Sequence, residues 1–142
     1  GPVSRREGIA LVLKKIDEIA GDSPVYLMGD FNVDQNNESF QLLKSSPRFE
    51  DTFETAKLRY ALNGTPNKFD GNAKTESRID HIFVTKGVPV RRYGILTDSY
   101  RAAMTPDPED SQSGNFPKEV TFEKFVNRLP SDHFPVLAET VD

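Results

Sequence analysis

Three short stretches of this sequence combine acidic, amide and imidazole groups at the ends of apolar runs. They are Gly29-Asp30-Phe31-Asn32, Arg78-Ile79-Asp80-His81 and Ser131-Asp132-His133. A folded chain accepts few polar groups beside buried strands unless those groups pair with one another or act on a ligand. We interpret the three stretches as parts of one site that cleaves a phosphoester.

Phosphoester hydrolysis requires an activated water, stabilisation of charge on the phosphate oxygens and usually a divalent metal. Asp132 is the natural metal carboxylate, because Mg²⁺ prefers oxygen ligands. His133 can act as a base or a polarising donor near neutral pH, and the carboxylate of Asp80 is available to fix its tautomer. Asp30 and Asn32 would point to the same side of an extended backbone, where the carboxylate orients the water and the amide steadies developing charge.

Each stretch also has a purely structural interpretation. A Gly-Asp pair that ends a strand is often only a turn, and Asp-His pairs are often satisfied surface or core groups. The coincidence of three chemically complementary strand ends favours a site over three unrelated turns. His81 is different, because its alternation with Ile79 and Phe83 predicts a structural histidine under a helix.

The length and composition limit the classes of protein to consider. A chain of 142 residues is the size of one domain, here residues 1–142, and it contains no cysteine that could form disulfides or bind a metal. No apolar run is long enough to cross a membrane, so the expectation is a soluble piece of protein whose compartment stays open. A formal charge of −4 and a pI near 5.2 argue against a broad basic surface for duplex binding.

The first half of the chain is expected to alternate helix and strand. Residues 4–7 form a capping box that should begin a helix, and Gly21 should end it. Its apolar stripe comprises Ile9, Val12, Leu13, Ile16 and Ile19. Residues 25–28 predict a strand buried on both faces, residues 34–37 a turn that caps a short helix, and residues 51–53 a brief strand.

The second half contains two expected loops and three expected strands. Residues 63–76 form a loop, in which Phe69 is either an anchor or a substrate-facing ring. Residues 78–85 form a strand that should pair with a second strand at 90–97, and residues 134–141 form the last strand. Between them, a mobile insertion is expected at 98–129, whose end contains a helix that Thr121 caps and that repeats apolar side chains at Phe122, Phe125, Val126 and Leu129.

The sequence resembles the endonuclease/exonuclease/phosphatase family, a superfamily of metal-dependent phosphoesterases. Three segments carry the resemblance in order, spacing and strand context: residues 29–32, residues 78–83 (Arg-Ile-Asp-His-Ile-Phe) and residues 131–136 (Ser-Asp-His-Phe-Pro-Val). The resemblance implies an α/β fold, a four-layer α/β sandwich in which two mixed sheets lie face to face with helices on the outside.

The resemblance also implies residue roles. Asp30 and Asn32 position the nucleophilic water and the phosphate oxygens, Asp132 is a metal ligand for Mg²⁺ or Mn²⁺, and His133 with Asp80 behind it is the catalytic pair. A segment similar to Asn67-Lys68-Phe69 lines the substrate cleft in the family, so Asn67 and Phe69 become substrate-binding candidates. The substrate is a phosphoester, whether nucleic acid, phosphoinositide, sphingolipid or small phosphodiester.

Family members are considerably longer, and their first half supplies an asparagine, a glutamate and another cleft residue that have no candidate here. We therefore expect a C-terminal part of the domain, with half of the catalytic site and little activity alone. Half of a sandwich would expose an apolar sheet face, which predicts association with a second copy or with the missing half. A non-catalytic binding or interaction module that keeps the fold is the alternative function.

Overall fold

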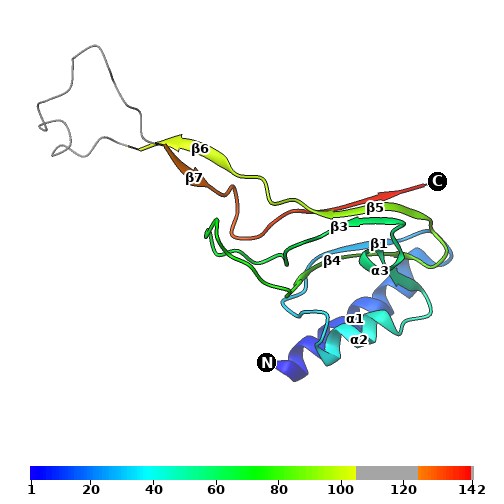
Figure 1. The fold of residues 1–142 in the computed structure, drawn as a ribbon. Coiled ribbons are helices and arrows are strands. Elements are labelled where there is room, and N and C mark those ends of the chain that lie inside the picture. Colours follow the sequence, from blue (N-terminus) through cyan, green and yellow to red (C-terminus); the bar gives the residue numbers. More distant parts are fainter. Residues whose placement is uncertain (105–124, 142) are drawn as a thin grey trace, which may run out of the picture.

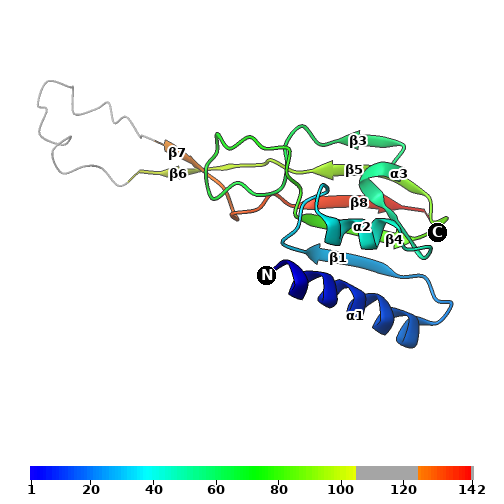
Figure 2. The ribbon, with the colours of Figure 1, turned by 90° about the horizontal axis from the view of Figure 1, so that it is seen from below.

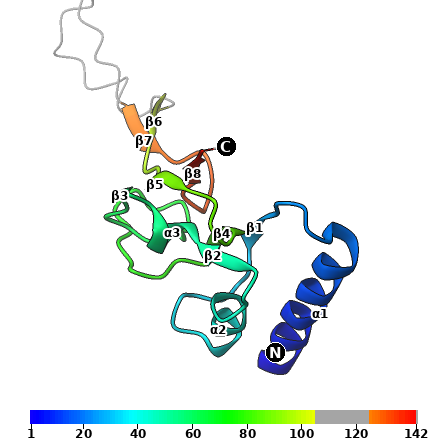
Figure 3. The same cartoon turned by 90° about the vertical axis from the view of Figure 1, so that its right-hand side faces the viewer.

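The computed structural model describes residues 1–104 and 125–141 (Figure 1). Two small sheets lie face to face, and two helices cover the outer face of one of them, as the view along the strands shows (Figure 3). The architecture is mixed α/β, as the resemblance implied. Within the described residues, no helix is both long and apolar enough to cross a membrane.

The first sheet has the order β1-β4-β2 and carries the helices α1 and α2. Strand β4 (Asp80–Thr85) lies in the middle, antiparallel to β1 (Tyr26–Asp30) and to β2 (Phe49–Asp51). Helices α1 (Pro2–Ala20) and α2 (Glu38–Lys44) pack on one face of this sheet (Figure 2). The core between them is made by Ile9, Val33, Phe40, Leu43, Phe49 and Phe83.

Helix α1 was predicted, but its start and two residues of its expected apolar stripe, Val12 and Ile19, differ, because both side chains are exposed. Ile9 is buried and Leu13 and Ile16 pack against the core, whereas Ile19 is exposed. The helix begins at Pro2, with Gly1 as N-cap and no side-chain capping bond, so the predicted capping box at residues 4–7 is wrong. Proline suits a first helical position because its ring already fixes a helical φ and its missing amide needs no partner there.

Strand β1 is less buried than its apolar sequence predicted. Leu27 packs against the core below the sheet, but Tyr26 and Met28 on the opposite face are exposed. The expectation of a strand buried on both faces is therefore wrong. The reason is that β1 is an edge strand, and β8 of the second sheet covers its outer face only in part, through contacts such as that of the Tyr26 hydroxyl with Thr140.

The second sheet has the order β3-β5-β8. Its central strand β5 (Val90–Ile95) is parallel to β3 (Leu58–Tyr60) and antiparallel to β8 (Val136–Thr140). The face turned toward the first sheet buries Tyr93, Ile95, Leu129 and Phe134. The predicted pairing of residues 90–97 with residues 78–85 is wrong, because β1 and β2 already occupy both edges of β4 and β5 joins the other sheet.

Two further expectations about local structure are corrected. The strand predicted at residues 51–53 ends at Asp51, whose side chain instead accepts the amide of Phe53 and caps the short helix α3 (Thr52–Thr55). Residues 125–128 form strand β7 (Phe125–Arg128), which pairs with β6 (Tyr100–Ala103), and not the predicted helix. Thr121 and Phe122, the expected start of that helix, lie outside the described residues.

The corrected segment at residues 125–129 had an ambiguous pattern. Its apolar residues fit a helical repeat, but a run this short also fits a strand. Pairing with β6 satisfies the backbone amides and carbonyls of β7, and this long-range partner decides the outcome. The β6-β7 pair extends away from the two sheets (Figure 1).

Candidate active site

Asp80 and His133 form a direct pair. Asp80 is the first residue of β4, and His133 lies in the turn that precedes β8. The Nδ1 atom of His133 is 2.8 Å from Oδ2 of Asp80, and both side chains are partly buried. With its proton on Nδ1, the imidazole donates to the carboxylate and keeps the lone pair of Nε2 for another partner.

The carboxylate of Asp30 lies beside this pair. Antiparallel pairing of β1 with β4 places Asp30 opposite Asp80 in the register. One ligand atom from each of Asp30, Asp80 and His133 lies within 4.8 Å of the others. The structure therefore brings together three of the four residues predicted as catalytic.

Asn32, the fourth predicted residue, has a different backbone geometry from the one expected. Its φ is 53°, a left-handed conformation, and its amide donates to Oδ1 of Asp30 over 2.7 Å. The expectation that Asp30 and Asn32 share one side of an extended backbone is therefore wrong. Asparagine tolerates this conformation better than most residues. The side chain of Asn32 is exposed, so its carboxamide group is accessible to a ligand.

Asp132 lies next to the pair in sequence but outside the group of three. Its side chain is exposed, and its Oδ1 accepts from the hydroxyl of Ser131 over 3.4 Å. Its main-chain carbonyl accepts from the amides of Asn67 and Lys68, at 2.8 and 3.0 Å. Its role as a metal ligand remains a prediction.

The two predicted substrate-binding residues differ in their surroundings. Asn67 is only 1% exposed, and its Oδ1 accepts the amide of Phe69 over 2.7 Å, so its side chain shapes the loop. Phe69 is 64% exposed with a φ of 61°, which is uncommon for a bulky residue. An exposed ring does not anchor a loop, and a role of Phe69 in substrate binding remains a prediction.

His81 lies on the opposite face of β4, where the alternation predicted it. The ring is buried beneath α2 next to Phe40, and its Nε2 is 2.9 Å from the carbonyl oxygen of Val33. Burial lowers the pKa of His81, although this hydrogen bond acts in the opposite direction. A neutral His81 that donates to Val33 fixes the chain just after Asn32.

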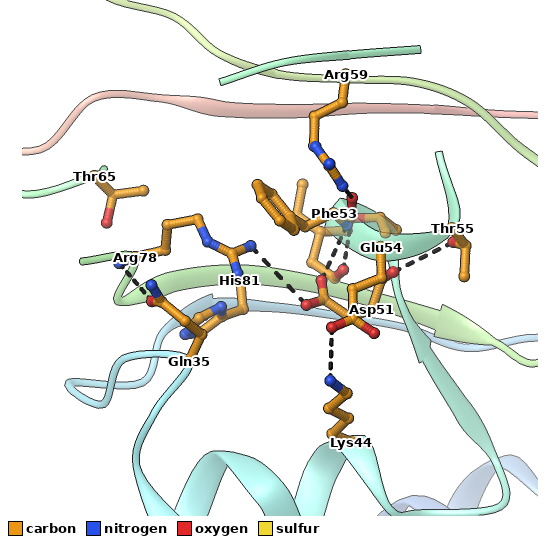
Figure 4. Close-up of polar contacts among 12 residues, drawn as sticks. Gln35, Lys44, Asp51, Phe53, Glu54, Thr55, Arg59, Thr65, Arg78 and His81 are labelled. Carbon is orange, nitrogen blue, oxygen red and sulfur yellow. Dashed lines mark hydrogen bonds and ion pairs between the residues drawn. The ribbon is translucent and has the colours of Figure 1, made fainter. Parts of the chain in front are cut away.

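A buried arginine supports β4 behind the site (Figure 4). The guanidinium of Arg78 lies 3.3 Å from the centroid of the Phe53 ring, and its Nη1 is 4.0 Å from Oδ2 of Asp51. Burial raises the pKa of Asp51, and the arginine partly offsets this effect. The amide of Arg78 also donates to Oε1 of Gln35, which ties β4 to the segment that follows Asn32.

The pair opens into a surface hollow. Asp80 and His133 share its lining with Met28, Gly29, His81, Ile82, Ser131, Phe134, Pro135 and Val136. Apolar side chains thus surround one side of a polar pair that solvent can reach. This arrangement allows a bound group to meet the imidazole of His133 and the carboxylate of Asp80 together.

Comparison with known proteins identifies the family to which the chain belongs. Residues 2–133 match the sequence profile of the Endonuclease/Exonuclease/phosphatase family. The chain belongs to this family. Its members are hydrolases that include phosphatases, nucleases and sphingomyelinases. Among the curated proteins, none matches the sequence.

Several solved structures are similar to the chain. The mannosyl-6-phosphatase of Bacteroides thetaiotaomicron VPI-5482 is 42% identical with a TM-score of 0.81, over 100% of this chain and 47% of that one. A Bacteroides vulgatus protein of the same family is 26% identical with a TM-score of 0.71, over 99% and 45% of the two chains. The beta toxin of Staphylococcus aureus, solved with bound magnesium ions, shares the fold at 21% identity and a TM-score of 0.51, over 94% and 43%. This chain spans less than half the length of these structures.

Proposed function

We propose that the chain carries the C-terminal part of the active site of a metal-dependent phosphoester hydrolase. The observation that supports this most is the 2.8 Å contact between His133 and Asp80, with the carboxylate of Asp30 beside it. An isolated structural ion pair does not require a second carboxylate at its open side. An acid-base site does, because proton transfer and water orientation require separate groups.

Each residue then has a defined task. Asp80 keeps the proton of His133 on Nδ1 and stabilises the imidazolium when Nε2 takes up a second proton. Asp30 accepts a hydrogen bond from the attacking water through its free oxygen, since its other oxygen is bound to the amide of Asn32. The side-chain amide of Asn32 donates to a phosphate oxygen and stabilises the charge that develops there.

The oxygen donors of this region fit part of a Mg²⁺ shell. Mg²⁺ commonly binds one or two carboxylates together with water and substrate phosphate. Asp132 is exposed and can supply one such carboxylate, whereas the free oxygen of Asp30 orients the water and Asp80 is engaged by His133. When bound, the ion, Mg²⁺ or Mn²⁺, would neutralise charge on the phosphate. We propose that the remaining ligands come from protein outside these 142 residues.

The mannosyl-6-phosphatase at 42% identity favours a sugar phosphate as the first substrate to test. Nucleic acid, phosphoinositide, sphingolipid and small phosphodiesters remain in the comparison because the same residues suit all of them. The acidic pI weighs against long duplex DNA, whose binding depends on cationic side chains.

A hydrolysis panel tests the proposal. Mannose 6-phosphate, sphingomyelin, a phosphoinositide and plasmid DNA are each incubated with the 142-residue chain and with the longest natural polypeptide that contains it, with and without Mg²⁺. We expect Mg²⁺-dependent hydrolysis by the longer polypeptide and little by the chain alone. Robust hydrolysis by the chain alone, abolished by His133→Ala, would refute the proposal that half of the site is missing.

The alternative function is a binding or interaction module that keeps the fold without the chemistry. It predicts that the longer polypeptide binds a phosphoester in the panel but never turns it over. The Asp80–His133 contact argues against it, because it is a pair suited to proton transfer, which binding alone does not need.

A further inference from the structure

Thr65 lies in the loop at residues 63–76, on the side that contacts the proposed pair. It is 0% exposed, and its side chain reaches across to the beginning of β4 (Figure 4). Its hydroxyl oxygen accepts the amide of Ile79 at 3.0 Å and the amide of Asp80 at 3.3 Å. The side chain thus binds the main chain of the residue that carries the carboxylate.

The main chain of Thr65 reaches the other member of the pair. Its carbonyl accepts the amide of Phe134 over 2.7 Å, and Pro66 forms an isolated β-bridge with His133. Its own amide donates to the carbonyl of Ser77 over 3.0 Å. One buried residue therefore connects the strand that bears Asp80 with the turn that bears His133.

The close approach at this point has a backbone requirement. A Cβ atom on Gly64 would lie 1.9 Å from the carbonyl oxygen of Ser77, so only glycine fits before Thr65. Asn67 and Lys68 then donate their amides to the carbonyl of Asp132. Residues 64–68 thus connect the start of β4, which bears Asp80, with the turn that bears His133. Among these five residues, Thr65 is the only one whose side chain binds β4.

We propose that Thr65 is a positioning residue that sets the separation between Asp80 and His133. The proposal rests on the proposed function for its catalytic consequence, but not for its geometry. Without the hydroxyl, the amides of Ile79 and Asp80 lose their acceptor at a buried point where water is excluded. The start of β4 can then move away from the loop and carry Asp80 with it. Because hydrogen bonds weaken steeply with distance and angle, the 2.8 Å contact between Asp80 and His133 would be lost.

The test compares Thr65→Val with Thr65→Ser. Valine keeps the shape and removes the hydroxyl, whereas serine keeps the hydroxyl. Thr52→Val is the matched control, because Thr52 is also 0% exposed and its hydroxyl donates to Ile82 on the same strand, over 2.7 Å. All variants are made in the 142-residue chain and in the longer polypeptide, and circular dichroism checks their folding.

The first measurement is the low-field proton NMR signal of His133 Nδ1–H, which reports the hydrogen bond to Asp80 directly. We expect Thr65→Val to lose this signal, Thr65→Ser to keep it and Thr52→Val to keep it despite a comparable loss of stability. A folded Thr65→Val with an unchanged signal would overturn the proposal, as would loss of the signal in the control. Absence of the His133 Nδ1–H signal from the wild-type chain would also overturn the proposal.

The second measurement is turnover by the longer polypeptide. We expect Thr65→Val to lower kcat by about tenfold or more with little change in KM, because misplaced groups slow chemistry more than binding, and Thr65→Ser to restore it. An unchanged kcat in folded Thr65→Val would overturn the catalytic consequence. If no substrate is hydrolysed by the wild type, the proposed function fails, while the NMR result still decides the positioning role.

If the Thr65→Val variant does not fold, a third measurement, made on the wild type, tests the proposal. Hydrogen exchange in the wild-type chain should then show slow exchange of the amide of Asp80, as a bonded buried amide requires. Fast exchange there would contradict the hydrogen bond on which the proposal depends.

Discussion

At the scale of single residues, the site depends on carboxylates with different surroundings. Asp80 is partly buried and engaged by His133, whereas Asp30 and Asp132 are exposed. Asp51 is buried behind β4, and burial raises its pKa. Under the proposed function, Asp80 serves proton transfer, Asp30 the water and Asp132 the metal, while Asp51 is structural.

Asp80→Asn should separate charge from shape. Asparagine preserves the size of the side chain but cannot stabilise an imidazolium on His133, so we expect kcat of the longer polypeptide to fall about a hundredfold or more. Steady-state kinetics would measure this change. Asp22→Asn, an exposed aspartate in the turn after α1, is the matched control, and a comparable loss there would point to net charge as the cause.

His81 predicts a pH dependence of stability. Burial lowers the pKa of His81 in the folded chain, so below about pH 6.5 the unfolded chain takes up a proton that the folded chain refuses. The free energy of unfolding should therefore fall as the pH is lowered through this range, by at most about 1.4 kcal/mol per pH unit. Urea unfolding of the wild type and His81→Gln measures the difference.

The glutamine variant should lack this part of the pH dependence. Asp51 contributes with the opposite sign, since its raised pKa favours the folded state as the pH falls toward 3.8. It is present in both proteins and His81 is one of the smaller influences on it, so most of this contribution cancels. Parallel curves for the wild type and His81→Gln would show that His81 does not resist protonation.

At the scale of elements, local capping signals were reliable where one side chain decides the geometry. Asn37 caps α2 by accepting the amide of Ser39 over 2.9 Å, as the turn at residues 34–37 predicted. Gly21 follows the last residue of α1, as predicted, but its φ of 53° and ψ of −122° are not the left-handed helical conformation that the prediction implied. The prediction that Ser4 caps α1 was wrong because the helix begins earlier, at Pro2.

Asn37→Ala should destabilise the chain by about 1 kcal/mol, the usual cost of removing an N-cap acceptor. Chemical denaturation measures it, and Asn37→Ser should recover most of the loss because a hydroxyl can accept the same amide. Asn36→Ala, at the exposed neighbouring position, should change stability by less than about 0.5 kcal/mol. Equal effects at both positions would exclude capping as the cause.

Elements that depend on long-range partners were not predictable from their own residues. The edges of β4 are filled by β1 and β2, so β5 could not pair where a simple hairpin would put it. Phe125, Val126 and Leu129 fit a helical repeat, yet pairing with β6 makes a strand. In both cases the deciding contact is remote in sequence.

In the site too, local sequence predicted some features, and contacts remote in sequence determine the others. The residue types identified Asp80 and His133, and the alternation along β4 identified His81 as structural. The proximity of Asp30 depends on the register between β1 and β4, and Thr65 bonds to amides 14 and 15 residues away. No local pattern marks a threonine in a loop as the acceptor of those amides.

At the scale of the whole molecule, the outer face of the second sheet exposes large apolar side chains beside the ion pair of Arg92 and Glu139. Tyr60, Gly94 and Leu137 are paired in one row across the three strands, and Leu58 lies two residues before Tyr60 on the same face. Leu58, Tyr60 and Leu137 are 64%, 66% and 55% exposed. Such a face commonly marks an interaction surface.

We expect the 142-residue chain to self-associate through this face when it is studied alone. Sedimentation velocity should show a concentration-dependent increase in mass, and Leu58→Lys combined with Leu137→Lys should reduce it, because each adds a charge that association would bury. A chain that stays monomeric at high concentration, or a double variant that associates equally, would contradict this expectation.

The central claim is that His133, held by Asp80 and flanked by Asp30, performs phosphoester hydrolysis. The most direct measurement is the rate of phosphoester hydrolysis by the longest natural polypeptide that contains these residues, in saturating Mg²⁺, for the wild type and for His133→Ala. We predict Mg²⁺-dependent turnover that falls about a hundredfold or more in the folded variant. Turnover that persists unchanged in His133→Ala would contradict the claim.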